Sequence, residues 1–217
     1  MARIPFQITD AAAAKITKKL QKEFRHNRLA LFDDMNVIGV KKHVSKLYKD
    51  TYKIIKKEFV SILNPLYKEI YDEAFALGFD GDPQDLDEAW IEEFFEEFNP
   101  VTKYVFKSEL SRKQSRLFES LVASTAERVQ SYKTAENLLK RQVQQYGIEL
   151  EDTVTKVAFG DAGVEQVKWV SEHDFKTCGI CSELDGQIFP LEDAPPKQHY
   201  NCRCYLIPVK ESKAEKP

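Results

Sequence analysis

Four cysteines and one histidine in the last quarter of the sequence have the spacing of a metal site. Cys178 and Cys181 form a CxxC pair, and His199, Cys202 and Cys204 follow in the run HYNCRC. Two thiolates on one tight turn can bind a single tetrahedral ion at ~2.3 Å. The 17 residues between Cys181 and His199 fit the gap between paired zinc knuckles. These five side chains predict a structural Zn²⁺ site, and the sequence leaves open which four of them bind.

Two other kinds of chemistry compete for the cysteines. A redox CxxC normally opens a helix, whereas the turn signal Asp185-Gly186 follows Cys181 closely, so a metal site is favoured over a redox pair or buried free thiols. A deaminase-type catalytic zinc does not fit, because Thr177 stands where proline is required and no His-x-Glu precedes it. Four or five ligands indicate a closed site, which stabilises a fold and does not activate water.

The N-terminal residues and the overall charge limit the class of protein. The start of the sequence lacks the apolar core of a secretion signal, and no apolar run approaches the ~20 residues that span a bilayer. We therefore expect synthesis in a reducing cytoplasm, no membrane contact and no disulfide framework. A net charge of −3 among 217 residues excludes a uniformly basic nucleic-acid binder but not a local basic patch.

The residues before the cysteines show the periodicity of helices. A first helix carries Ile16, Leu20 and Phe24 at four-residue steps, and a second is expected from about 41 to 63. Asn64-Pro65 predicts the start of a third helix, which Gly78 ends. A fourth helix is indicated by apolar residues in steps of four: Leu86, Trp90, Phe94 and Phe98.

Beyond Asn99-Pro100, residues 101–146 predict one long helix or a helical hairpin with a break near Ser131, ended by Gly147. A helix from about 149 to 159 and a strand over 166–170 follow. Asp185-Gly186 predicts a β-hairpin, and residues 202–207 read as a strand that places Cys202 and Cys204 on one face.

The sequence therefore predicts a mostly α protein. Residues 1–148 form an elongated helical region, residues 149–209 form a small zinc-stabilised α+β module, and residues 210–217 form a polar tail.

The module carries a specific resemblance. Its signature comprises Trp169, Asp174, the CxxC of 178–181, Asp185-Gly186, Pro195-Pro196, the HxNCRC of 199–204 and Pro208. Over about residues 152–209 the sequence resembles the phage head morphogenesis family, the Mu F-like minor head proteins. The resemblance implies a non-enzymatic minor capsid protein in the head interior near the portal, made in the host cytoplasm. Its partners would be the portal protein and capsid or scaffold components, and its role procapsid assembly and genome packaging or ejection.

Two stretches of opposite charge suggest further contacts. Residues 80–97 contain nine acidic residues and no lysine or arginine, whereas basic residues outnumber acidic ones over 101–141. Arg112, Lys113 and Arg116 could neutralise the phosphates of double-stranded DNA without reading its bases. The simpler interpretation of both stretches is a solvated helix face.

Two further functions remain open at the level of sequence. In a zinc-dependent nuclease, His199 and Asn201 would serve catalysis beside the metal, but no carboxylate cluster for a second metal lies nearby. A zinc DNA-binding regulator would need a basic recognition helix beside the cysteines, whereas residues 182–193 are acidic.

Overall fold

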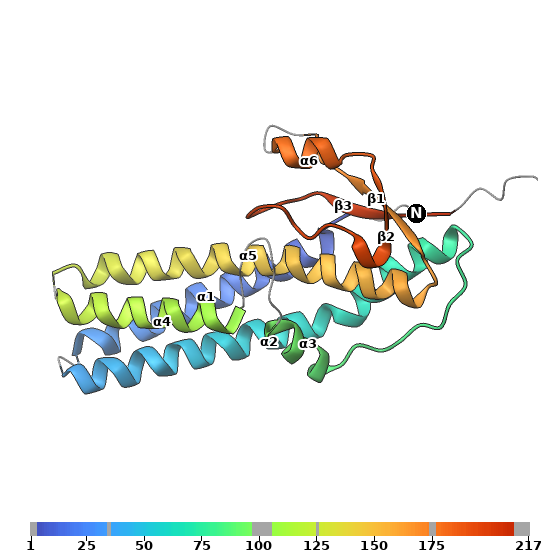
Figure 1. Cartoon of the computed structure of the whole chain (residues 1–217). Helices are drawn as coiled ribbons and strands as arrows, with labels where there is room; N and C mark the ends of the chain where they lie inside the picture. Colours follow the sequence, from blue (N-terminus) through green and yellow to red (C-terminus); the bar gives the residue numbers. More distant parts are fainter. Residues whose placement is uncertain (1–3, 34–35, 97–105, 125, 174–176, 211–217) are drawn as a thin grey trace, which may run out of the picture.

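The computed structural model describes residues 4–210 except 34–35, 97–105, 125 and 174–176, and the side chains of 29–33 are also not described. Long helices form an elongated bundle, and a small sheet covers one end of it (Figure 1). In chain order the elements are α1 (Gln7–Asp33), α2 (Val37–Ala76), α3 (Glu88–Glu96), α4 (Phe106–Ala123), α5 (Arg128–Asp161), β1 (Gln166–Val170), α6 (Gly179–Leu184), β2 (Ile188–Pro190), η1 (Leu191–Asp193) and β3 (Tyr205–Val209). The predicted fold class, mostly α with a small α+β part at the C-terminal end, is confirmed.

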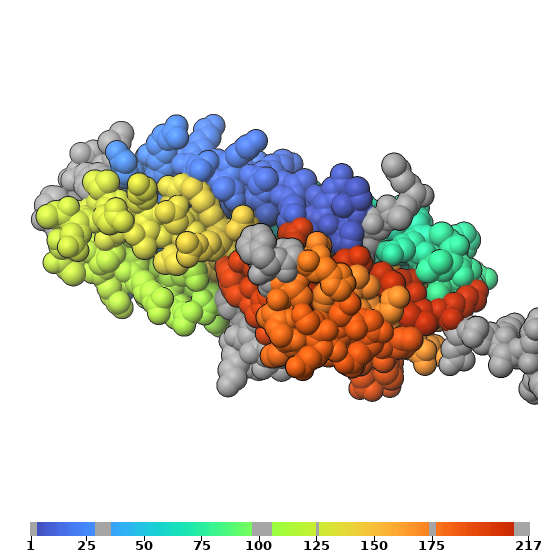
Figure 2. Space-filling view, turned by 90° about the horizontal axis from the view of Figure 1, so that it is seen from above, coloured from blue at the N-terminus to red at the C-terminus, as the bar shows by residue number. Residues whose placement is uncertain are grey.

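The bundle and the sheet share one hydrophobic core. The apolar stripe Ile16, Leu20 and Phe24 of α1 is buried against α2 and α5, and the same cluster continues to Trp169 of β1. The sheet is antiparallel in the order β2-β1-β3. Seen from above, the C-terminal residues cover one end of the bundle while the other end projects beyond them (Figure 2).

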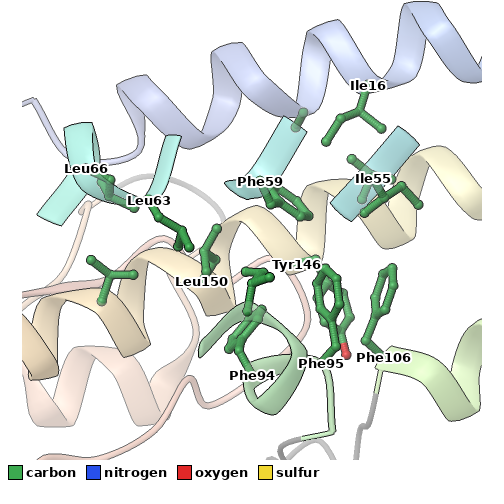
Figure 3. Packing of buried hydrophobic residues seen from close by; sticks show 14 of the residues in the cluster. Ile16, Ile55, Phe59, Leu63, Leu66, Phe94, Phe95, Phe106, Tyr146 and Leu150 are labelled. Carbon is green, nitrogen blue, oxygen red and sulfur yellow. The ribbon is translucent and has the colours of Figure 1, made fainter. Parts of the chain in front are cut away.

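Aromatic rings hold α3 against the middle of the bundle (Figure 3). The Phe95 ring stacks on Phe106 with centroids 4.5 Å apart, and Phe106 meets Tyr146 of α5 edge-on at 4.1 Å. The fourth predicted helix is thus confirmed over 88–96, with its apolar side buried. Phe98, which was expected to extend that side, lies outside the described residues, as do Asn99-Pro100 and the tail from 211.

The predicted break at Asn64-Pro65 is wrong, because α2 continues through it. A proline inside a helix costs ~3 kcal/mol or more through its missing N–H and its clash with the preceding turn. Here Leu63 and Leu66 on either side are buried in the shared core, and this packing outweighs the local preference. The Asn64 side chain caps no helix; it accepts a hydrogen bond from the backbone N–H of Leu86 at 2.9 Å.

The predicted end of a helix at Gly147 is also wrong. Helices α4 and α5 form the expected hairpin, which turns between Ala123 and Arg128, a few residues before Ser131. Helix α5 then runs through Gly147 and replaces the separate helix predicted from 149. A Cβ at Gly147 would lie 3.4 Å from the Thr9 carbonyl oxygen, so α1 and α5 lie close together here, with room for an alanine but not for a larger side chain. Helix α5 crosses residue 148, the boundary predicted between the helical region and the module.

Two local predictions near the cysteines are corrected as well. Asp185-Gly186 does not join two strands, because α6 precedes it; the turn leads to β2, which pairs with β1. Strand β3 begins at Tyr205, so Cys202 and Cys204 precede the strand, although both are buried. The strand also ends later than the predicted residue 207: Pro208 lies inside β3, which an edge strand tolerates because its outer side has no strand partner.

Candidate metal centre

The CxxC pair lies at the start of a short helix. Cys178 is the N-cap of α6, and its Sγ accepts the backbone N–H of Cys181 at 3.4 Å. The sequence argument that no helix follows this pair is therefore wrong, and it no longer counts against redox chemistry. Cys181 is buried at the first turn of α6 while Cys178 is half-buried at its edge, so both sulfurs come from one turn.

The second half of the site is a turn between η1 and β3. Asn201 has a φ of 60°, a left-handed conformation that asparagine adopts more readily than most residues. The reversal lets the Cys202 N–H donate to the carbonyl of His199 at 3.2 Å. Asn201 of the HxNCRC run thus has a conformational role that the sequence interpretation did not identify.

The distances around Cys181 are those of a tetrahedral site. Its Sγ lies 3.5 Å from His199 Nε2 and 3.7 Å from Cys202 Sγ. With Zn–S of ~2.3 Å and Zn–N of ~2.0 Å, a regular tetrahedron has edges of ~3.5 Å between sulfur and nitrogen and ~3.8 Å between two sulfurs. The structure brings all five predicted residues together, as two groups of three that share Cys181: Cys178, Cys181 and His199, and Cys181, Cys202 and Cys204.

The His199 ring is oriented as a ligand. Its Nδ1 lies 3.0 Å from the carbonyl oxygen of Tyr200. A proton on Nδ1 satisfies that carbonyl and leaves the lone pair of Nε2 directed at the sulfur of Cys181. Backbone partners of this kind fix the tautomer of metal-binding histidines.

The sulfurs differ in protonation. The pKa of Cys202 falls to about 5, chiefly because the Cys204 thiol donates a hydrogen bond to it and also because the Lys197 ammonium is near. Burial raises the pKa of Cys181 to about 12, and the hydrogen bond to Cys202 raises the pKa of Cys204. Cys202 is therefore the sulfur of this cluster that loses its proton most readily, and a bound ion would displace protons from its neighbours.

Ser171 and Asp185 support the cluster. The Ser171 hydroxyl donates to the Cys181 carbonyl at 2.6 Å and lies 3.7 Å from the Cys204 sulfur. The backbone N–H of Ser171 donates to Asp185 Oδ1 at 2.7 Å. The bond from Ser171 gives Asp185 of the signature a structural role, and Gly186 has a φ of 76°, a left-handed conformation that glycine adopts without strain. Ser171 was not predicted, and no sequence signal marks it.

Lys197 is a buried cation beside the cluster, with 1% of its surface exposed. Its Nζ donates to the carbonyl of Cys204 and lies 3.2 Å from Asp152 Oδ1. It also lies over the rings of Phe6 and Trp169, at 5.2 and 5.9 Å. Burial lowers the pKa of Lys197, but the nearby Asp152, Cys202 and Glu151 together outweigh burial, and the net effect is a raised pKa. Lysine is almost never fully buried unless paired, so the sequence did not indicate this role.

The loop that carries His199, Cys202 and Cys204 is fixed to helices α1 and α5. Arg203 forms two hydrogen bonds with the Asp10 carboxylate of α1, at 3.0 and 2.8 Å. On α5, the Tyr200 hydroxyl donates to the Arg141 carbonyl at 2.6 Å, and the Asn201 N–H donates to Gln145 at 2.7 Å. The donor cluster is thus held against the bundle from two sides.

The predicted DNA-contacting residues lie apart from this cluster, on α4. Arg112 and Lys113 both pair with Glu109, at 2.5 and 3.0 Å. Arg116 is exposed and lines a cavity of about 270 Å³ between α2, α4 and α5. Two of the three cations are therefore partly neutralised within their own helix.

The predicted acidic stretch is also partly neutralised. Lys56 of α2 contacts Glu88 and Glu92 of α3, and Lys107 of α4 contacts Glu92 and Glu96. The Tyr52 hydroxyl donates to Glu92 at 2.8 Å. This side of α3 is a structural contact with the bundle.

Comparisons with known proteins agree with the signature. A family described as Phage Mu protein F like protein matches residues 117–207, a segment that includes α5, β1, β2, the first part of β3 and all five metal candidates. The resemblance to the Mu F-like head proteins is confirmed over this segment, and it indicates a phage head protein. No curated protein and no solved structure matches the chain. In the described part of the chain, no helix is long and apolar enough to cross a membrane.

Proposed function

We propose that this protein is a minor head protein that acts at the portal, inside the phage head, in procapsid assembly and in genome packaging or ejection. The observation that carries the proposal is the match over 117–207 together with the geometry of its signature. Trp169, Asp185 and the HxNCRC run, which are far apart in sequence, all contribute to one cluster. The expected partners are the portal protein and capsid or scaffold components.

The metal is proposed to be a structural Zn²⁺ held by Cys178, Cys181, His199 and Cys202. The tetrahedral distances from Cys181 and the orientation of the His199 ring support this set. Cys204 is the remaining candidate; its thiol donates a hydrogen bond to Cys202 and its sulfur lies 3.7 Å from the Ser171 hydroxyl, contacts that suit a supporting role. When bound, the ion would join α6 to the loop before β3.

A non-enzymatic role is supported by the same geometry. In the nuclease alternative, His199 would have to be available to the substrate, whereas its ring faces the sulfur of Cys181. Asn201 would have to act in catalysis, whereas its left-handed backbone serves the turn. These contacts favour a closed structural site.

Co-expression tests the proposed function. The full chain, carrying an affinity tag, is produced with the portal and major capsid proteins of the same phage. We expect it to co-purify with the portal and to sediment with procapsid-sized particles. Arg203→Ala removes the contact with Asp10, and its co-purification is compared with that of wild type to test whether the signature loop is needed for binding to the portal. Absence of the chain from both portal and particles would contradict the proposal.

A further inference from the structure

The outer face of the first half of α2 carries a row of lysines that the sequence interpretation did not single out. Residues 41–57 contain seven lysines and a single carboxylate, Asp50. Six of these lysines are exposed, and five of the six recur in steps of three or four residues, so these five lie on one side of the helix. We call them the lysine row: Lys42, Lys46, Lys49, Lys53 and Lys57.

The row faces solvent because the opposite side of α2 is buried. Val44, Leu47, Thr51 and Ile55 belong to the interior, and they fall between the lysines in sequence but about half a turn away around the helix. This part of α2 lies along the edge of the bundle away from the sheet (Figure 1). At 1.5 Å per residue, the row is ~22 Å long.

Few acidic side chains neutralise the positive charge of the lysine row. Asp50 lies 3.3 Å from Lys46 and 3.9 Å from Lys53, so one carboxylate is shared between two lysines. The acidic residues of α3 contact Lys56, which lies beside the row and is less exposed. Among the described residues, no ion pair is formed by Lys42, Lys49 or Lys57.

The residue types on the face of α2 that carries the lysine row indicate which class of partner would bind there. Protein interfaces are depleted in lysine and need apolar or aromatic anchors, and membrane-surface helices bury Trp, Phe or Leu. Between Lys42 and Lys57 no large hydrophobic side chain is exposed. Lysines without such anchors suit a regular polyanion, and a DNA duplex presents one charge per ~1.7 Å of its axis, or ~13 charges along the row.

We propose that the lysine row of α2 binds the phosphate backbone of duplex DNA without sequence preference. The choice of DNA as the polyanion rests on the proposed function, in which the chain lies where DNA is concentrated. The charge and exposure of the row are independent of that function. The cations of α4 are fewer, and Glu109 engages two of them, so α2 and not α4 provides the main contact.

The experiment compares two matched triple substitutions by fluorescence anisotropy. The full chain is titrated onto a duplex of about 30 base pairs at about 50 to 200 mM KCl. Five neutralised phosphates give a slope of log affinity against log salt of ~−4.5, a ~500-fold loss over this range. With Lys42, Lys49 and Lys53 changed to Gln, two contacts remain and the slope falls to ~−1.8, a ~12-fold loss.

The α4 variant, with Arg112, Lys113 and Arg116 changed to Gln, is the control. We expect its slope to change by less than ~1. The inference is overturned if wild type shows no salt-dependent binding, if the α4 variant loses the binding instead, or if the α2 variant binds DNA with the affinity and salt slope of wild type. Incorporation into particles, measured separately, distinguishes this failure from failure of the proposed function.

Discussion

Lys197→Met tests how the buried charge beside the donor cluster stabilises the fold. The substitution keeps an unbranched side chain of similar length but removes the ammonium. It leaves the Asp152 carboxylate, of which 8% is exposed, without its main partner, and it leaves the Cys204 carbonyl without a donor. An unpaired buried charge is costly because neither water nor protein solvates it.

The expected cost follows from the remaining contacts. Breaking a buried ion pair by removing one partner costs ~3–5 kcal/mol. Lys156 still lies 3.4 Å from Asp152 and is partly exposed, so the lower end applies, and we expect a loss of ~3 kcal/mol. For a chain of this size, that corresponds to a fall in Tm of ~6–12 °C. The double variant Lys197→Met/Asp152→Asn removes the stranded charge and should recover ~2 kcal/mol.

Urea unfolding measures these values, with far-UV circular dichroism and tryptophan fluorescence as probes. A Trp90→Phe background leaves Trp169, whose ring contacts Lys197, as the sole tryptophan. Lys57→Met, an exposed lysine on α2, is the control and should change the free energy of unfolding by less than ~0.5 kcal/mol. A stabilising role for the buried charge of Lys197 is refuted if Lys197→Met is as stable as this control, or if the double variant is less stable than Lys197→Met alone.

Three further predictions concern single residues in the bundle and the turn. The Lys56 hydrogen bond lowers the pKa of Glu92 to about 2. A carboxyl group with a lowered pKa in the folded state stabilises the fold at pH values above about 4.5, and this stabilisation is lost as the pH falls towards 2. Thermal melts of Glu92→Gln should therefore differ from wild type at pH 7 and converge with it near pH 2. Gly147→Ala should be tolerated, since its Cβ would lie 3.4 Å from Thr9. Gly147→Leu should lower the free energy of unfolding in urea by ~1–3 kcal/mol. Equal stability of the two variants would contradict the close approach of α1 and α5. Asn201→Gly should keep the stability of the left-handed turn, and Asn201→Ala should lose ~1 kcal/mol in the same assay; the opposite order would show that the side chain matters more than the backbone.

Helical periodicity was the most informative feature of the sequence. The four-residue steps of Ile16, Leu20 and Phe24 correspond to residues that are fully or almost fully buried, because the helix repeat places them on one side. The errors arose at Pro65 and Gly147, where local preference for a helix end is strong. Long-range packing overrides both preferences, and the contact between Gly147 and Thr9 could not be inferred from either local sequence.

The candidate site shows a similar division. The spacing of the CxxC and HxNCRC runs was enough to predict that five donors converge, because cysteine and histidine at such intervals are rare outside metal sites. The supporting residues were not predictable. Ser171, Asp152 and Lys197 are ordinary polar residues in sequence, and their role depends on partners brought together only by the fold.

Native mass spectrometry of the purified full chain tests most directly whether the CxxC and HxNCRC runs form a structural metal centre. We expect one zinc ion per chain, lost in Cys181→Ser because that sulfur belongs to both groups of donors, and retained in Cys204→Ser. A folded wild-type chain without metal, or zinc bound as fully in Cys181→Ser as in wild type, would contradict this expectation.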